Sequence, residues 1–221
     1  MKKITILFLA IFSISCKASN FEELMVAPEK IVEEKTISEY PNIWWQWAYS
    51  IPRDINPVWD RTGENCHQGQ SGNVWFLAGG FGSSIIKRKC EIPSGKYIFF
   101  PVINMVYWKP NNKTLSCDQA KEYAALNNDT LIEINIELDS KKASNPAHTR
   151  LSSEQCFNIF SRVAKNIESY DAYPSATDGF WIMLKPLSKG AHILKFQAKY
   201  NRENEAFGKM VQDIEYELIV N

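Results

Sequence analysis

Histidine is scarce in this sequence: its 221 residues include only His67, His148 and His192. A zinc site needs three or four ligands at suitable spacing, and the sequence contains neither an HxH nor an HExxH pattern. Cys66 and His67 are adjacent, so in a strand their side chains would point to opposite faces. We therefore expect neither a metal site nor a cofactor.

The sequence also lacks an excess of charge of either sign, since 25 Lys and Arg balance 25 Asp and Glu. It contains no basic stripe, which argues against nucleic acid as a partner. It contains no apolar run of about eighteen residues, so no segment is predicted to span a membrane. Hydrophobic residues nevertheless make up 45% of the chain and aromatic residues 13%, a composition that excludes a wholly disordered chain.

The first nineteen residues, MKKITILFLAIFSISCKAS, have the pattern of an export signal. Two lysines form a positive n-region, residues 4–14 are apolar apart from one serine, and small residues follow. This apolar stretch is too short to cross roughly 30 Å of hydrocarbon as a helix. We therefore predict an exported chain with a signal peptide over residues 1–15 or, alternatively, 1–18.

The five cysteines support export. If cleavage follows Ser15, Cys16 becomes the mature N-terminus, where bacterial lipoproteins carry their lipid. If cleavage follows Ala18, Cys16 is removed and the protein is secreted or periplasmic. In both cases four cysteines remain, which fits two disulfides in an oxidising compartment. Three pairings are possible, and sequence order favours Cys66–Cys90 with Cys117–Cys156.

The beginning of the domain is indicated by a change in composition. Residues 16–37 are charged and poor in aromatics, and Pro28 interrupts any helical pattern, so we predict a flexible tether there. A single domain is then expected over residues 38–221. Thr36 and Glu39 have the spacing of a capping box. The aromatic-rich segment that follows, YPNIWWQWAYS, is expected to be helical until the next proline ends it.

The remainder of the chain is predicted to be rich in strands. Pro101 should bend its strand or place it at a sheet edge. Residues 118–126 predict one clear amphipathic helix with Asp118 as its cap. Residues 140–155 predict a polar loop. The pattern of residues 157–163 fits either a helix or a strand. Apolar or alternating runs between turn residues predict strands over 73–79, 84–92, 96–108, 131–139, 180–184, 191–200 and 214–220.

Many short strands with few helices are typical of one architecture. The sequence therefore predicts a mainly β, single-domain protein, an antiparallel β-sandwich or jelly roll with one or two short helices.

Several segments rich in aromatic residues and glycine follow one another in a fixed order: WWQWAYSIP, INPVWDRTGENCHQGQSGNVWFLAGGFG, RKCEIPSGKYIFFPVIN, DGFWIMLKPLSKGAHILKF and IEYELIV. Together they resemble a widespread family of exported bacterial proteins of unknown function. They cover well under half of the chain. The part between Asn111 and Ser169 departs from the usual pattern of that family, as do Ala191 and Lys195. The resemblance implies export and domain boundaries, but it implies no catalytic residue.

Seven tryptophans are many for this length. Indole rings can stack on sugar rings or other flat ligands, or they can fill the core beneath a helix that crosses a sheet. We expect the second role for four of them: Trp44, Trp47, Trp75 and Trp181. The other three lie next to expected loops and are the candidates for ligand binding: Trp45, Trp59 and Trp108.

Catalysis by carboxylates is a different hypothesis. Four side chains lie in expected loops or at strand ends: Asp60, Glu64, Asp178 and His192. Two carboxylates on facing loops can act as acid and base on a glycoside. The same carboxylates can instead cap turns or pair with nearby arginines.

The sequence favours an exported, non-catalytic binding protein of the cell envelope that holds a carbohydrate or an envelope protein through an aromatic-rich face. The first alternative is a carbohydrate-active hydrolase or lyase that uses the loop carboxylates. The second is a structural envelope component or an inhibitor or immunity-type protein. Attachment to a membrane is expected only through a lipid at Cys16, and the oligomeric state stays open.

Overall fold

The structure, a computed structural model, describes residues 20–201 and 209–221 apart from residues 28, 83, 166 and 168. The predicted signal peptide and the lipidation site expected at Cys16 lie outside these residues. The described α-helices are α1 (Phe21–Leu24), α2 (Tyr40–Ser50) and α3 (Cys117–Ala125). The described strands are β1 (Val74–Phe76), β2 (Ser84–Ile92), β3 (Tyr97–Trp108), β4 (Leu131–Leu138), β5 (Lys141–Lys142), β6 (Arg150–Ser152), β7 (Ser175–Leu184), β8 (Gly190–Asn201) and β9 (Lys209–Val220).

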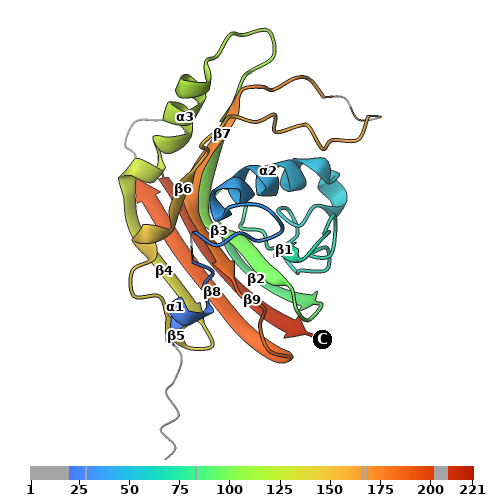
Figure 1. The fold of residues 1–221 in the computed structure, drawn as a ribbon, viewed down its shortest axis with the longest axis vertical. Coiled ribbons are helices and arrows are strands. Elements are labelled where there is room, and N and C mark those ends of the chain that lie inside the picture. Colours follow the sequence, from blue (N-terminus) through green and yellow to red (C-terminus); the bar gives the residue numbers. More distant parts are fainter. Residues whose placement is uncertain (1–19, 28, 83, 166, 168, 202–208) are drawn as a thin grey trace, which may run out of the picture.

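These strands form two sheets, which confirms the predicted β-sandwich (Figure 1). The four-stranded sheet has the order β1-β3-β7-β6, and the five-stranded sheet has the order β2-β9-β8-β4-β5. Most neighbouring strands are antiparallel. Two pairs are parallel, β1 with β3 and β2 with β9, so each sheet is mixed. Parallel pairing could not be derived from the sequence. The alternation of apolar and polar residues indicates a strand, but it does not show which strand lies beside it or in which direction that strand runs.

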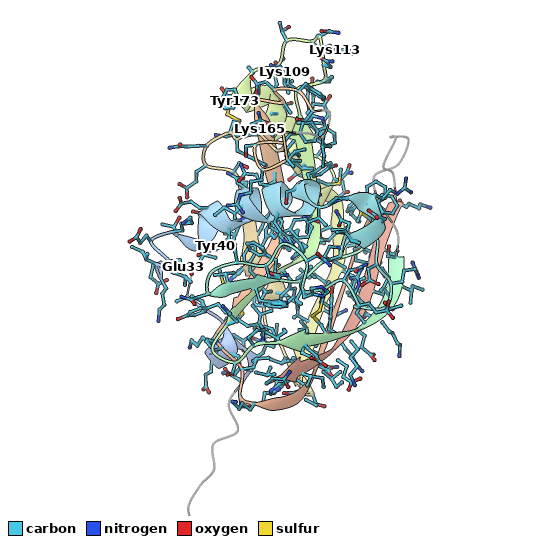
Figure 2. The ribbon with its side chains drawn as sticks, turned by 90° about the vertical axis from the view of Figure 1, so that its right-hand side faces the viewer. Glu33, Tyr40, Lys109, Lys113, Lys165 and Tyr173 are labelled. Atoms are coloured by element: carbon cyan, nitrogen blue, oxygen red, sulfur yellow. A yellow bond between two sulfur atoms is a disulfide. The ribbon has the colours of Figure 1, made fainter. Side chains whose placement is uncertain are left out.

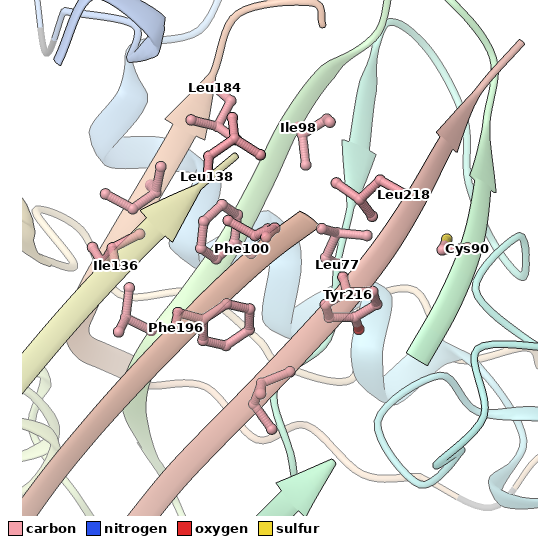
Figure 3. Packing of buried hydrophobic residues seen from close by; sticks show 14 of the residues in the cluster. Leu77, Cys90, Ile98, Phe100, Ile136, Leu138, Leu184, Phe196, Tyr216 and Leu218 are labelled. Carbon is pink, nitrogen blue, oxygen red and sulfur yellow. The ribbon is translucent and has the colours of Figure 1, made fainter. Parts of the chain in front are cut away.

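A hydrophobic core fills the space between the sheets (Figure 3). Phe100 of β3 and Phe196 of β8 lie with their ring centroids 4.9 Å apart. Both side chains are completely buried. Burial of side chains of this size stabilises the fold by about 1.5–3 kcal/mol each relative to leaving them exposed.

A second core lies between α2 and the outer face of the four-stranded sheet (Figure 1). Trp44 and Trp47 of α2 are buried there, and the Trp44 ring lies 5.6 Å from that of Trp181 on β7. Trp75 is buried in the core between the sheets. The burial expected for these four tryptophans is therefore confirmed, but only three of them lie beneath the helix: Trp44, Trp47 and Trp181. The molecule thus has three layers: a helix, then the four-stranded sheet, then the five-stranded sheet.

The segment expected to be a tether is, over its described residues, packed onto the domain. Phe21 is fully buried in the core between the sheets, and the Val26 amide donates to the Met183 carbonyl oxygen at 2.8 Å. Further along, the Glu33 carboxylate accepts a hydrogen bond from the Asn73 amide at 2.6 Å. The folded domain therefore begins well before residue 38, because a few apolar side chains dock this charged segment.

The same segment is held at its end by Tyr40, which lies close to Glu33 (Figure 2). The Tyr40 hydroxyl donates to the Val32 carbonyl oxygen at 2.7 Å. Burial, together with the negative charges of Glu33 and Glu39, raises the pKa of Tyr40 to about 12. The predicted capping box is also present, since the Thr36 amide donates to the Glu39 carboxylate at 2.7 Å.

Two local expectations need correction, and for Pro101 the structure decides between two alternatives. Ser116, not Asp118, caps α3, because its hydroxyl accepts the Gln119 amide at 3.1 Å. Pro101 lies inside the four-stranded sheet, and the register of β3 against β7 shifts between Pro101 and Ile103. It therefore bends its strand and does not place it at an edge. Residues 140–155, expected to be loop, contain β5 and β6, which are short strands at sheet edges.

Two disulfides are present among the described residues, Cys66–Cys90 and Cys117–Cys156. This pairing is the one that sequence order favours. Each closes a loop, of 24 and 39 residues, and on the loop-entropy model each destabilises the unfolded chain by about 3–4 kcal/mol. The bonds indicate maturation in an oxidising environment. No helix within the described residues has the length and apolar character needed to cross a bilayer.

Candidate ligand-binding site

A groove of about 360 Å³ lies at the C-terminal end of α2. We call it the aromatic groove, because four aromatic side chains line it: Trp45, Tyr49, Trp59 and Phe81. The other lining residues are Ala48, Ile51, Arg53, Asn56 and Val58. Small-molecule sites are typically concave, mostly apolar and about 300–1,000 Å³ in volume. The aromatic groove has each of these properties.

Three side chains from two loops form a stack at the rim of this groove. The rings of Trp59 and Phe81 are stacked with centroids 4.5 Å apart and planes inclined by 22°. The guanidinium carbon of Arg53 lies 4.2 Å from the centroid of the Trp59 ring. Trp59 is 42% exposed and Phe81 is 64% exposed. Large aromatic side chains that stay accessible in this way are characteristic of binding surfaces.

The buried Arg88 of β2 holds both loops from beneath. Its Nε donates to the Asp60 carbonyl oxygen at 2.8 Å, next to Trp59 in the chain. Its Nη1 donates to the carbonyl oxygens of Ala78 and Gly79, each at 2.9 Å, in the loop that leads to Phe81. A single guanidinium therefore joins the supports of Trp59 and Phe81.

Two buried amides complete this support. Asn56 donates to the carbonyl oxygens of Ala48 and Ile51 at 2.7 and 2.9 Å, and its own oxygen accepts the Val58 amide. Gln212 of β9 accepts the Gly80 amide at 2.7 Å and donates to the Gly82 carbonyl oxygen. The backbone on both sides of the Trp59–Phe81 stack is therefore anchored.

The three tryptophans predicted to bind ligand do not share one site. Trp45 and Trp59 line the aromatic groove. The indole of Trp45 also donates to the Thr177 hydroxyl at 2.8 Å, which fixes one wall of the groove. Trp108 packs instead beside Tyr49 and donates to the Tyr170 hydroxyl at 3.0 Å. It is therefore in the layer behind the groove wall.

Asp178 lies on the opposite face of the four-stranded sheet from the groove. On β7, Trp181 faces α2 while Phe180 and Ile182 face the core between the sheets. Because side chains alternate along a strand, Asp178 shares the face of Phe180, whereas Thr177 faces Trp45. The structure thus separates this carboxylate from the aromatic groove.

The Asp178 carboxylate takes part in a buried polar cluster. It is only 5% exposed and accepts from the Arg150 Nε at 3.0 Å and from the Asn128 amide at 3.0 Å. Burial raises the pKa of Asp178, and the charge of Arg150 and these hydrogen bonds partly oppose that effect. Arg150 also pairs with Asp129 at 2.6 Å. This cluster joins β6 and β7 to the segment that follows α3.

Asp60 and Glu64 lie in the loop that carries Trp59. Asp60 accepts hydrogen bonds from the backbone amides of Thr62, Gly63 and Asn65 at 2.7–3.0 Å. Burial alone would raise the pKa of Asp60, but these bonds and the charge of Arg88 hold it below its ordinary value. Glu64 is exposed and is not a lining residue of the groove. Asp60 therefore shapes the loop.

His192 lies at the other end of the molecule from Asp178. Its Nδ1 is 2.7 Å from the Asp139 carboxylate, and its Nε2 is 2.9 Å from the Ser188 carbonyl oxygen. Tyr200, eight residues further along β8, accepts a hydrogen bond from Asn127 beside the Asp178 cluster. Along the strand, His192 and Tyr200 are therefore roughly 26 Å apart. The four residues proposed for catalysis are thus not brought together.

Sequence reasoning missed Arg53 and Phe81 as groove residues, and Arg88, Asn56 and Gln212 as their support. Only Phe81 could have been found from a sequence pattern. It is a bulky apolar residue among the glycines of GGFG, and a residue in such a turn is expected to lie outside the hydrophobic core. Among the described residues, no group of three His, Cys, Asp or Glu side chains is arranged to hold a metal ion.

No family model matches the sequence of this chain, and no curated protein matches it.

Proposed function

We propose that the protein is an exported, non-catalytic binding protein of the cell envelope, and that the aromatic groove holds its ligand. The observation that carries the proposal is the stacked, half-exposed pair of Trp59 and Phe81. Its loops are anchored by Arg88, Asn56 and Gln212. An anchored aromatic surface loses little conformational entropy on binding, which favours affinity.

Export is supported by the N-terminal pattern of the sequence and by the two disulfides. The proposal includes a lipid at Cys16 if cleavage follows Ser15. Mass spectrometry of native protein tests both points. We expect a mature chain that begins at Cys16 with a diacylglyceryl group, or at Ser19 without it, and two intact disulfides. A chain that retains Met1 and four free thiols contradicts export.

Calorimetric titration tests binding. We expect oligosaccharides from a panel of envelope glycans to bind the wild-type protein without being cleaved. Trp59→Ala and Phe81→Ala should each weaken binding by about 2 kcal/mol, roughly 30-fold, as central aromatic contacts do.

Tyr107 and Tyr123 supply the control, because they form another partly exposed aromatic pair, 4.8 Å apart, that does not line the groove. Tyr107→Ala should leave the affinity unchanged. Equal losses in Tyr107→Ala and Trp59→Ala would show that binding is not located in the groove. Failure of every ring ligand to bind would reject the proposed function.

A further inference from the structure

We propose that the aromatic groove selects ring ligands that carry a carboxylate, and that Arg53 binds this group. The inference rests on the proposed function and adds the chemical class of the ligand. Arg53 is the one charged side chain among the nine described residues that line the groove. The apolar walls would receive the ring, and the guanidinium would receive the anion.

Arg53 is held in place without its hydrogen-bonding capacity being used. Its guanidinium lies over the Trp59 ring, at 4.2 Å, and is thus positioned by a cation–π contact. Within the described part of the chain, this ring contact is the only ion pair, hydrogen bond or ring interaction of the Arg53 side chain. The N–H groups at the edge of the guanidinium therefore have no acceptor from those residues.

The shape of a guanidinium explains the preference for a carboxylate. It is planar and presents its N–H donors in a fork that matches the two oxygens of a carboxylate. A guanidinium that lies over an aromatic ring keeps its donor edge free while its face is occupied. If the ligand were a neutral ring, the N–H groups of Arg53 would stay hydrogen-bonded to water. A carboxylate can instead accept two hydrogen bonds from them and neutralise the charge of the guanidinium.

Nearby carboxylates of the protein do not serve this purpose. The side chain of Asp60 is occupied by the backbone amides of its own loop. Asp54, the neighbour of Arg53 in the chain, is exposed and does not line the groove. Two kinds of ligand share the required chemistry, namely uronate sugars and aromatic carboxylic acids.

The test measures affinity by calorimetry for three probes: a galacturonic acid trisaccharide, the methyl ester of the same trisaccharide, and phenylacetate. We expect at least one acid to bind, with the trisaccharide acid favoured over its ester if the ligand is a uronate. Arg53→Gln should weaken binding of the acid roughly 10- to 100-fold, as loss of hydrogen bonds to a charged group does, and should leave any binding of the ester unchanged.

Arg61→Gln is the matched control, because Arg61 belongs to the same loop and is exposed, but donates to the Ile85 carbonyl oxygen outside the groove. This variant should bind as the wild type does. If the trisaccharide acid binds and Arg53→Gln loses this binding, the ligand class is the uronate sugars. If phenylacetate binds and Arg53→Gln loses this binding, the ligand class is the aromatic carboxylic acids.

If the wild-type protein binds the trisaccharide acid and its methyl ester with equal affinity, and Trp59→Ala binds neither, the role of Arg53 is overturned. The proposed function is then left intact. If none of these probes binds but a neutral ring of the glycan panel does, the preference for a carboxylate is overturned. Absence of binding by every probe and every glycan overturns both proposals.

Discussion

The guanidinium of Arg88 donates to the phenolic oxygen of Tyr216 at 2.9 Å, and both side chains are buried. The Tyr216 hydroxyl in turn donates to the Ala78 carbonyl oxygen at 2.7 Å. The Arg88–Tyr216 pair joins β2 and β9 to the two loops of the aromatic groove. Loss of this pair should lower both the stability of the fold and the affinity for ligand.

Arg88→Met should lower the free energy of unfolding by about 3–4 kcal/mol, because several buried carbonyl oxygens would lose a charged donor. It should also weaken ligand binding, since the loops of Trp59 and Phe81 lose their common anchor. Urea unfolding and calorimetric titration measure the two effects. Lys87→Met is the control, because the neighbouring Lys87 is exposed and its ion pair with Glu215 contributes at most about 1 kcal/mol. Equal stability of the two variants would contradict the role of Arg88.

Arg150→Met should destabilise the fold by about 3–5 kcal/mol at pH 7, because Asp178 would be left as a buried charge without its partner. Burial already raises the pKa of Asp178, and loss of Arg150 should raise it further. The folded variant then binds a proton more tightly than the unfolded chain does, so its stability should recover as the pH falls.

Unfolding in urea at pH 7 and at pH 4.5 measures this recovery relative to the wild type. Lys199→Met serves for comparison, because the Lys199–Glu133 pair lies on the exposed face of the five-stranded sheet. That variant should lose less than about 1 kcal/mol. A loss in Arg150→Met that does not change with pH would show that Asp178 is not the group responsible.

His192 should make stability depend on pH near neutrality. Burial lowers its pKa, but the hydrogen bonds to Asp139 and to the Ser188 carbonyl oxygen outweigh this and raise the pKa above its ordinary 6.5. A raised pKa means that the folded state binds the proton more tightly. The contribution of His192 is therefore complete below the unfolded pKa and is lost as the pH rises through the folded pKa.

Unfolding measured from pH 6 to pH 8 should show this loss in the wild type and not in His192→Gln. Asp139→Asn should reduce it as well, because the carboxylate stabilises the imidazolium. Titration of the imidazole by NMR gives the folded pKa directly, and a value below 6.5 would refute the assignment.

Phe21→Ala should destabilise the fold by about 3–5 kcal/mol, as expected for a fully buried aromatic side chain in a core. The substitution Ile31→Ala lies in the same charged segment, but Ile31 is 64% exposed, so it should have little effect. Thermal unfolding of the two variants compares them directly. If both match the wild type, the segment contributes nothing to stability and the expectation of a tether stands.

Local patterns were sufficient for much of the architecture. The alternation of buried and exposed residues in β2 is complete from Ser84 to Ile92, and the predicted strand has the same bounds. Trp44 and Trp47 were likewise recognisable as buried, because α2 repeats its indoles at helical spacing. The docking of the segment expected to be a tether was not predicted, because a few buried apolar side chains such as Phe21 decide it and hardly change the composition of the segment.

The candidate site was predicted only in part. Trp45 and Trp59 were predicted as ligand candidates because they lie next to expected loops, and both line the groove. The role of Asp178 was not predictable, because Arg150 and Asn128 approach it from elements 28 and 50 residues away. A sequence identifies ionisable groups, but it does not show which of them a fold pairs.

From the sequence alone followed most of the strands, the aromatic helix, the even set of cysteines and the aromatic surplus, because each is read from a local pattern or from a count of residues. Only the tertiary structure decided that Trp45, Arg53, Trp59 and Phe81 share one groove while Trp108 and Asp178 lie elsewhere. The physical reason is that strand order and the hydrogen bonds of one buried arginine bring the two loops together, and neither is encoded in a local pattern.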